Sequence, residues 1–386
     1  MRDVVVRRAR LFDVAIPLKE PFRISSGAMS VRHSLIVELE DDLGHIGYGE
    51  SAPFEKPFYS EETLDSARSL LENHFIPLLV GRPVSRPGEL LRLLTDGIVG
   101  NRMALAGVES AWWDLCAARE GKPLSGLVTA RLRELGVTEA WLQRSDRVEC
   151  GIALGIPEDG RLETIESRVG DAIDHGYRRV KLKVKPGWDI EPVMAARRVL
   201  DRLAPGLPLT VDANGAYDLE DHWDSLLRLD RERLTYIEQP LPGEALWDLC
   251  KLRTSVATPI CLDESLTSDA VARQVVEMGG PLVWNIKVQR VGGLEEACRI
   301  YARAAPSGAQ VWGGTMPETG IGAQAMLALG CHAGFCYPSD VEPSDRWYAA
   351  GSDTIELMMD RDGTMEVPLQ RPPVRRNGWR QLAEIS

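Results

Sequence analysis

Along most of the chain, short apolar runs alternate with longer stretches in which apolar positions recur at helical spacing. This alternation begins near residue 147 and continues to about residue 337. Strands buried on both faces form continuous apolar runs, and parallel strands need a crossover connection that is usually a helix. The pattern therefore predicts a series of parallel β/α units. The predicted strands lie at residues 148–153, 180–184, 209–211, 235–237, 260–262, 282–286, 309–312 and 334–337.

Residues 1 to about 125 have a different pattern, which predicts a separate α+β unit. Alternation over residues 35–40, a turn and a return run over residues 46–50 predict a β-hairpin. Two helices follow. Ser60 with the acidic residues after it is typical of a helix start, and residues 104–118 are apolar on several faces. A helix with that pattern is expected to be buried.

The tail after about residue 354 carries short strand-like pieces that do not continue the repeat. We expect it to return and pack on the N-terminal unit. The chain is therefore predicted to be an α/β protein. Its expected architecture is a modified (β/α)8, TIM-type barrel with an α+β capping domain formed by the N-terminal segment and the C-terminal tail. The predicted boundaries are 1–125 for the capping domain, 126–353 for the barrel and 354–386 for the returning segment.

Composition fits a globular protein of this size and narrows its environment. The chain has 386 residues, 44% of them hydrophobic, and no apolar run approaches the roughly 20 residues of a membrane span. The first residues lack the apolar core of a signal peptide. The seven cysteines show no paired zinc or redox spacing, which favours unpaired thiols in a reducing compartment. We therefore expect a cytoplasmic location.

The balance of charge bears on the class of partner. The formal net charge of −12 at pH 7 repels phosphate backbones and anionic lipids. This argues against nucleic-acid and membrane-surface partners. The class of partner that this charge favours is therefore a small-molecule substrate.

Residues of one chemistry stand at the ends of five successive predicted strands. Their charged side chains follow one another at intervals of 24 to 29 residues, close to the length of one β/α unit. Charged residues at the C-terminal ends of barrel strands are typical of an active site. The segments are 181–183 (Lys-Leu-Lys), 212–214 (Asp-Ala-Asn), 238–240 (Glu-Gln-Pro), 263–265 (Asp-Glu-Ser) and 285–287 (Asn-Ile-Lys).

Three carboxylates, Asp212, Glu238 and Asp263, each follow an apolar run. A single acid at a strand end is more often a helix N-cap or a surface charge. Three hard oxygen donors on adjacent strands, with no His or Cys beside them, instead favour a Mg²⁺ site over a zinc site, with Mn²⁺ as a substitute. The series therefore predicts a divalent metal centre.

The lysines predict two amine bases. Lys181 and Lys183 are two positions apart, so on a strand both side chains point to the same face. Two neighbouring ammonium groups, together with a nearby metal ion, would lower the pKa of Lys183 towards the working pH. Lys287, four strands further round, is expected to face Lys183 across the cavity. A lone strand-end lysine would more often be solvated or form a salt bridge.

These motifs, with 287–293 (Lys-Val-Gln-Arg-Val-Gly-Gly) and 318–322 (Glu-Thr-Gly-Ile-Gly), resemble the muconate lactonizing enzyme subgroup of the enolase superfamily. Residues 21–27 and 101–104 resemble parts of that family's capping domain, so the resemblance covers nearly the whole chain. Members of the mandelate racemase type would have a His/Asp pair in place of Lys287.

The resemblance implies removal of a proton α to a carboxylate, with Mg²⁺ stabilising the resulting enediolate. It implies catalytic acid/base roles for Lys183 and Lys287, assisting roles for Lys181 and Asn214, and Mg²⁺ ligation by Asp212, Glu238 and Asp263. Further substrate-binding residues expected from it are Ser26, Tyr59, Gln289, Thr315, Met316 and Glu318. Family members are often dimers or larger, so a homo-oligomer acting on a small-molecule carboxylate is expected.

Within the subgroup the chain most resembles the o-succinylbenzoate synthases and N-succinylamino acid racemases, which share one type of site. The sequence does not separate dehydration from racemisation. Another muconate lactonizing-type cycloisomerase or a dipeptide epimerase is an alternative. The epimerase is disfavoured because no Asp-x-Asp pair lies between Tyr337 and Tyr348. Alternatives of other classes are a Schiff-base aldolase using Lys183 or Lys287, which the acidic trio argues against, and a non-catalytic binding barrel.

Overall fold

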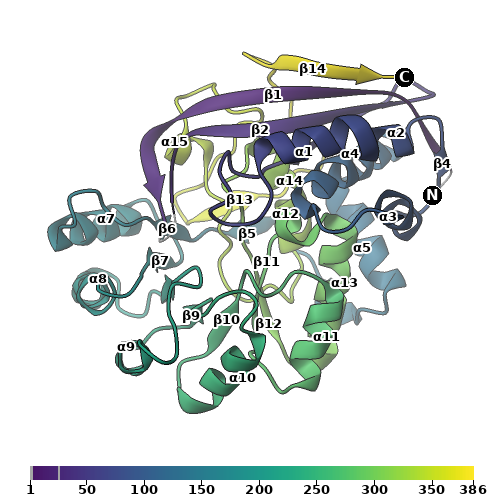
Figure 1. The fold of residues 1–386 in the computed structure, drawn as a ribbon. Coiled ribbons are helices and arrows are strands. Elements are labelled where there is room, and N and C mark those ends of the chain that lie inside the picture. The colour runs from purple at the N-terminus through teal and green to yellow at the C-terminus, as the bar shows by residue number, and fades with distance from the viewer. Residues whose placement is uncertain (1–2, 25–26) are drawn as a thin grey trace.

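The computed structural model describes residues 3–24 and 27–386, and it consists of a capping domain above a barrel of parallel strands (Figure 1). An antiparallel sheet forms the outer layer of the capping domain, in the order β14-β1-β2-β3, and β4 pairs with β1. The strands are β1 (Val4–Arg23), β2 (Ala28–Asp41), β3 (Ile46–Ser51), β4 (Pro83–Val84) and β14 (Arg380–Ile385). The hairpin predicted near residues 35–50 is the β2–β3 pair.

Helices cover one face of this sheet. They are α1 (Leu64–Leu70), the π-helix η1 (Leu71–Phe75), α2 (Ile76–Leu79), α3 (Pro87–Thr95) and α4 (Arg102–Glu120). Helix α4 is buried, as its apolar pattern predicts. It packs so closely on β3 that a Cβ atom on Gly49 would lie 2.2 Å from the carbonyl oxygen of Gly107. Glycine in β3 therefore lets the backbones of strand and helix approach each other.

The barrel contains seven parallel strands that pair in chain order from β6 to β12. They are β6 (Ile152–Leu154), β7 (Val180–Lys183), β8 (Leu209–Asp212), β9 (Ile237–Glu238), β10 (Ile260–Leu262), β11 (Val283–Ile286) and β12 (Gln310–Gly313). Nearly every residue in them is buried, because helices outside and side chains inside cover both faces. The outer helices are α7 (Leu162–Asp174), α8 (Ile190–Leu203), α9 (Trp223–Leu229), α10 (Leu246–Ser255), α11 (Asp269–Glu277), α13 (Leu294–Ser307) and α14 (Gly320–Gly330).

The eighth strand predicted at residues 334–337 is reduced to an extended segment. Phe335 bridges to Val311 of β12, and Ser339 bridges to Cys150 just before β6, both in parallel. The Gly151 amide also donates to the Ser339 carbonyl at 2.7 Å. Residues 335–340 therefore close the ring between the first and last barrel strands without forming a regular ladder.

The remaining elements connect these two parts. Short helices α5 (Leu124–Glu134) and α6 (Glu139–Leu142) lead into the barrel, α12 (Val288–Val291) follows β11, and α15 (Ser344–Trp347) follows the closing segment. In the tail, β13 (Thr364–Glu366) pairs with β5 (Arg147–Glu149), and β14 returns to pair with β1. None of the helices in the described residues is long and apolar enough to cross a membrane.

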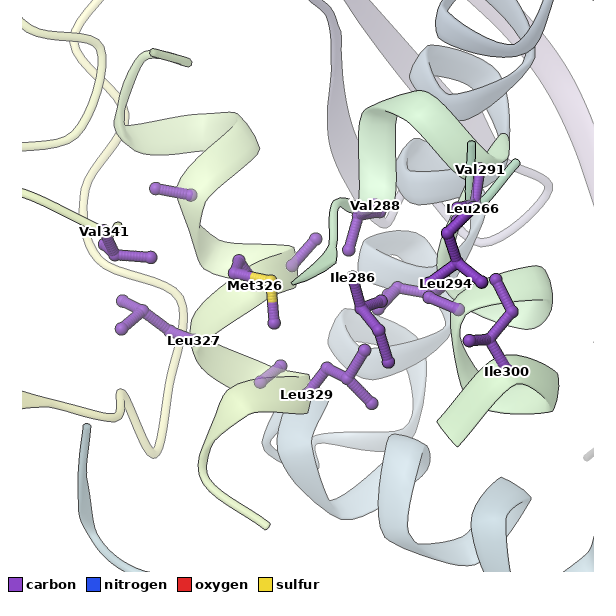
Figure 2. Packing of buried hydrophobic residues seen from close by; sticks show 14 of the residues in the cluster. Leu266, Ile286, Val288, Val291, Leu294, Ile300, Met326, Leu327, Leu329 and Val341 are labelled. Carbon is purple, nitrogen blue, oxygen red and sulfur yellow. The ribbon is translucent and has the colours of Figure 1, made fainter. Parts of the chain in front are cut away.

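The core is continuous between strand, helices and loops. Figure 2 shows buried side chains around Ile286 of β11, with Leu294 and Ile300 from α13 and Leu329 from α14. Because these residues are fully buried, they hold the strand ends at fixed positions. The fold class predicted from the sequence, a modified (β/α) barrel with an α+β capping domain, is confirmed.

Candidate active site

The charged residues predicted at the strand ends meet at one end of the barrel. Lys183, Asp212 and Glu238 are the last residues of β7, β8 and β9, and they stand in register as neighbours across the sheet. Asp263 and Lys287 come one residue after β10 and β11. Parallel strands with their C-terminal ends at one edge therefore bring all five side chains to the barrel mouth, below the capping domain.

The three carboxylates form a compact acidic trio. One oxygen atom from each of Asp212, Glu238 and Asp263 can be chosen so that all three lie within 4.8 Å of one another, and all three residues are buried. Within the described residues no His or Cys joins this group, and carboxylate oxygens at this spacing suit a hard divalent cation. The trio could therefore hold a metal ion.

Each acid of the trio also faces a lysine. The Nζ atom of Lys183 lies 2.6 Å from Asp212, that of Lys181 lies 3.0 Å from Glu238, and that of Lys287 lies 2.6 Å from Asp263. Buried charges need such partners, because an unpaired one carries a large desolvation cost. The lysines thus neutralise the trio and stand beside whatever the trio binds.

Two supporting groups complete the hydrogen bonding of the trio. Asn285 of β11 donates from Nδ2 to Oε1 of Glu238 at 2.8 Å. Arg290 of α12 donates to Asp263, opposite Lys287. Burial alone would raise the pKa of Asp263, but the Lys287 ammonium and the Arg290 guanidinium lower it to about 2. Asp263 is therefore held as a carboxylate.

The carboxylates around Lys181 keep its amine charged. Burial does lower its pKa, but Asp340, Glu238 and Asp212 together raise the pKa of Lys181 above its ordinary value. Asp340 lies 2.5 Å from the Lys181 ammonium, and the Trp312 ring lies 4.7 Å from it. Carboxylates outnumber cations around this amine, so it is a fixed positive charge.

Asn214 and Tyr59 connect the lysines to their surroundings. Asn214 has a left-handed backbone (φ 47°), which Asn tolerates better than most residues, and its Oδ1 accepts from Lys183 at 3.0 Å. The Tyr59 hydroxyl, from the loop after β3, accepts from Lys287 at 3.1 Å and donates to Asp263 at 3.3 Å. The capping domain therefore contributes directly to the barrel mouth.

A cavity joins the two opposed lysines, and most of the predicted site residues line it. From the predicted set, the lining includes Lys181, Lys183, Lys287, Asn214, Tyr59, Thr315 and Met316. Tyr59 and Asn214 also border a larger cleft of about 590 Å³ beneath the loop at residues 58–62. Lys183 and Lys287 come from strands on either side of the trio, which fits the predicted opposition across the cavity.

Three predicted substrate contacts do not line this cavity or cannot be placed. Gln289 is buried elsewhere, where its amide donates to the Glu50 carbonyl at 2.6 Å and accepts from the Ala52 amide at 3.1 Å. Glu318 precedes α14 and packs against Gly322. Ser26 lies outside the described residues.

Several lining residues were not predicted as site residues. Asp340 and Glu342 come from the segment after the reduced eighth strand, and Trp347 comes from α15. Phe22 and Ile24 reach the cavity from the end of β1. Asp340 had only a partial signal, since it is an acid three residues after the predicted eighth strand, whereas each acid of the trio follows its predicted strand directly. The apolar residues had none, because they do not follow a predicted barrel strand.

Comparisons with known proteins agree with this geometry. Residues 6–129 match the mandelate racemase / muconate lactonizing enzyme N-terminal domain, and residues 164–372 match the enolase C-terminal domain-like family. The chain is 39% identical to an N-succinylamino acid racemase of Thermus thermophilus, over 94% of this chain and 92% of that protein. It is 38% identical to an o-succinylbenzoate synthase of Geobacillus stearothermophilus, over 91% of this chain and 88% of that protein. A solved enolase superfamily member from Listeria innocua superposes with a TM-score of 0.87 at 32% identity, covering 99% of this chain and 98% of that one.

Proposed function

Because the chain belongs to the mandelate racemase and muconate lactonizing enzyme family of the enolase superfamily, we propose that it removes the proton α to a carboxylate and so forms an enediolate. The favoured reactions are o-succinylbenzoate synthesis by dehydration, N-succinylamino acid racemisation, or both. The observation that carries the proposal is the pair of lysines, Lys183 and Lys287, lining one cavity on either side of the acidic trio.

The acidic trio fits Mg²⁺, with Mn²⁺ as a substitute, because its donors are three buried carboxylates without nitrogen or sulfur ligands. The proposed ligands are Asp212, Glu238 and Asp263. A bound divalent cation would stabilise the second negative charge that proton removal creates on the substrate carboxylate.

The two lysines hold and move the proton. In a racemase, one lysine accepts the α-proton at its Nζ atom, and the other donates a proton to the opposite face of the enediolate. In a synthase, Lys183 takes the α-proton and then gives it to the hydroxyl group on the same side, which leaves as water, while Lys287 remains protonated and supports the enediolate charge. Lys181, kept cationic by Asp340, adds a fixed positive charge near the substrate carboxylate.

The direct test is solvent exchange at the α-carbon. With Mg²⁺ in D₂O, we expect deuterium to enter the α-position of an N-succinylamino acid, detected by loss of the α-proton NMR signal. The same preparation should then be given the hydroxylated precursor of o-succinylbenzoate, and loss of water should be followed. Exchange without dehydration supports a racemase, and both together support a bifunctional enzyme. If neither reaction occurs, the proposal is wrong.

The alternative functions make different predictions in the same assays. A cycloisomerase or a dipeptide epimerase would act on its own acid substrate and leave both proposed substrates unchanged. A Schiff-base aldolase would be trapped covalently by borohydride in the presence of a carbonyl substrate. Three buried acids at metal-ligand spacing beside the lysines count against the aldolase, because Schiff-base chemistry has no use for such a group.

A further inference from the structure

Apart from Asp340, the half of the cavity opposite the acidic trio has no task in proton removal. The trio lies on β8, β9 and β10, whereas the opposite wall comes from the end of β6, the residues after β12 and the segment from Asp340 to Trp347. A substrate with its carboxylate at the trio and its α-carbon between the lysines must direct its remaining groups towards this wall. The wall therefore selects the substrate.

Glu342 places a carboxyl group in this wall. Its side chain is 1% exposed and lines the cavity. Oε1 accepts from the Ala153 amide at 2.9 Å, but Oε2 has no hydrogen-bond partner in the part of the chain that the structure describes. The nearest cation is Arg346, whose Nε lies 3.6 Å from Oε2 and is itself without a partner. That distance is beyond a hydrogen bond, so one oxygen of a buried acid has no donor.

The neighbouring acid shows what a satisfied carboxylate in this segment looks like. Both oxygens of Asp340 are occupied, one by Lys181 at 2.5 Å and the other by Arg179. These cations hold the pKa of Asp340 well below its ordinary value despite burial. For Glu342, burial outweighs its neighbours and raises the pKa to about 7. The two acids lie in one segment, yet only Asp340 has a full set of partners.

Within the described residues, no other side chain of this wall donates a hydrogen bond to Glu342. Phe22, Ile24 and Trp347 are the large side chains of this part of the lining. An unpaired carboxylate oxygen in apolar surroundings is costly, and a donor supplied by a ligand would remove that cost. A positively charged donor would be bound most strongly, since charge-assisted hydrogen bonds are about twice as strong as neutral ones. A second carboxylate in the same place would be repelled.

We propose that Glu342 is a specificity-determining residue that binds a cationic nitrogen, an ammonium or a guanidinium, on the side chain of an N-acylamino acid substrate. This inference rests on the proposed α-proton chemistry and adds a substrate class to it. The cation occupies the free side of Oε2, where Arg346 approaches without a hydrogen bond.

The test compares two substrates that differ only in the charged group: Nα-succinyl-lysine and N-succinyl-norleucine. The readout is kcat/KM for α-proton exchange in D₂O with Mg²⁺. We expect the wild-type enzyme to favour the lysine derivative. In Glu342→Gln, kcat/KM for the lysine derivative should fall about 10- to 100-fold, while that for norleucine changes less than about 3-fold. Gln keeps an oxygen that can accept from Ala153, so the substitution removes charge and little else.

Two further variants separate specificity from structure. Asp345→Asn removes a neighbouring negative charge that is exposed to solvent outside the cavity, and it should leave the substrate ratio unchanged. Arg346→Met removes the nearby guanidinium and should raise the preference for the lysine derivative. Thermal unfolding of each variant checks that it is folded.

Distinct outcomes overturn the inference and the proposed function. Equal losses on both substrates in Glu342→Gln would show a structural role and overturn the inference alone. If the wild-type enzyme exchanges the α-proton of N-succinyl-norleucine as fast as that of Nα-succinyl-lysine, the inference is also overturned, even if Glu342→Gln fails to fold. No exchange with either substrate, nor with any other N-succinylamino acid, would overturn the proposed function and the inference with it.

Discussion

The two halves of the barrel mouth are built in different ways. In the acidic half, β7 to β11 each contribute one or two charged residues from a strand end, and every acid faces a lysine at 2.6 to 3.0 Å. The opposite half comes from the end of β6, the residues after β12, the segment from Asp340 to Trp347 and the end of β1. Regular strand ends fix the reacting groups, and irregular segments shape the space around them. The fold can therefore change its substrate without moving its acid/base groups.

Removing the metal should have the largest effect, and it should act only through the acidic half. Chelation with EDTA is expected to abolish α-proton exchange, and Mg²⁺ should restore it. Mg²⁺ should not restore exchange activity in Asp212→Asn, because one of the three proposed metal ligands has lost its charge. Binding can be followed without activity: a ligand at 100 times its Kd stabilises the folded state by about 2.7 kcal/mol. Mg²⁺ should thus raise the Tm of the wild type and of Asp224→Asn, an exposed control, but not that of Asp212→Asn.

Replacing either lysine should reduce racemisation by about 10³-fold, within the usual range for a lost general acid or base. The reason is that each amine serves one face of the substrate. Lys183→Ala should abolish deuterium exchange for one enantiomer and Lys287→Ala for the other. Chiral chromatography combined with NMR measures both quantities. Lys185→Ala, an exposed lysine just beyond β7, is the matched control. Loss of both enantiomers' exchange in each single variant would contradict the two-base assignment.

The difference between the regular strand ends of the acidic half and the irregular segments opposite them explains how much of the site the sequence could predict. Asp212, Glu238, Asp263 and the lysines are one β/α unit apart, and the core packing around residues such as Ile286 holds their strands in register. Spacing along the chain therefore translates directly into proximity. The seven regular strands were predictable for the same reason. The domain boundaries and the substrate contacts stay predictions.

In the half of the barrel mouth opposite the acidic trio, no regular spacing along the chain predicts which residues meet. The eighth strand is too irregular for period-2 alternation, so the side chains of Asp340 and Glu342 could not be assigned to the cavity from their positions in the sequence. Gln289 sits two residues after Lys287, yet α12 begins at Val288 and turns it towards the backbone of Glu50 and Ala52. The backbone geometry after a strand end decides these contacts, and the pattern of a single sequence does not predict that geometry.

Asp340 connects the two halves of the barrel mouth, because it lies in the irregular half and forms an ion pair with Lys181 of the acidic half. Asp340→Asn leaves Arg179 and Lys181 without their shared carboxylate. Breaking a buried ion pair costs about 3 to 5 kcal/mol, so a marked drop in the free energy of unfolding is expected from urea titration. We also expect kcat to fall about tenfold for cationic and neutral substrates alike, since a misplaced Lys181 affects the shared carboxylate end. A change confined to substrate preference would instead assign Asp340 to selection.

The smallest expected effect is a pH dependence of substrate preference. It tests the substrate-selecting half of the barrel mouth separately from the proton-transfer groups. The pKa of Glu342 is raised to about 7, chiefly by burial. The charged and titratable groups that face it are Arg346, Asp340, Arg179, Tyr177 and Cys150. Below that pH the carboxyl group is neutral and no longer attracts a cation, so the preference should weaken as pH falls and strengthen as pH rises. Between pH 8 and pH 6, the ratio of kcat/KM for Nα-succinyl-lysine over N-succinyl-norleucine should fall by about 3- to 10-fold. Any pH dependence of the proton-transfer step that both substrates share cancels in this ratio. Glu342→Gln, which cannot titrate, should give a flat ratio, and a ratio that changes with pH to the same extent in that variant would mean that another group discriminates between the substrates.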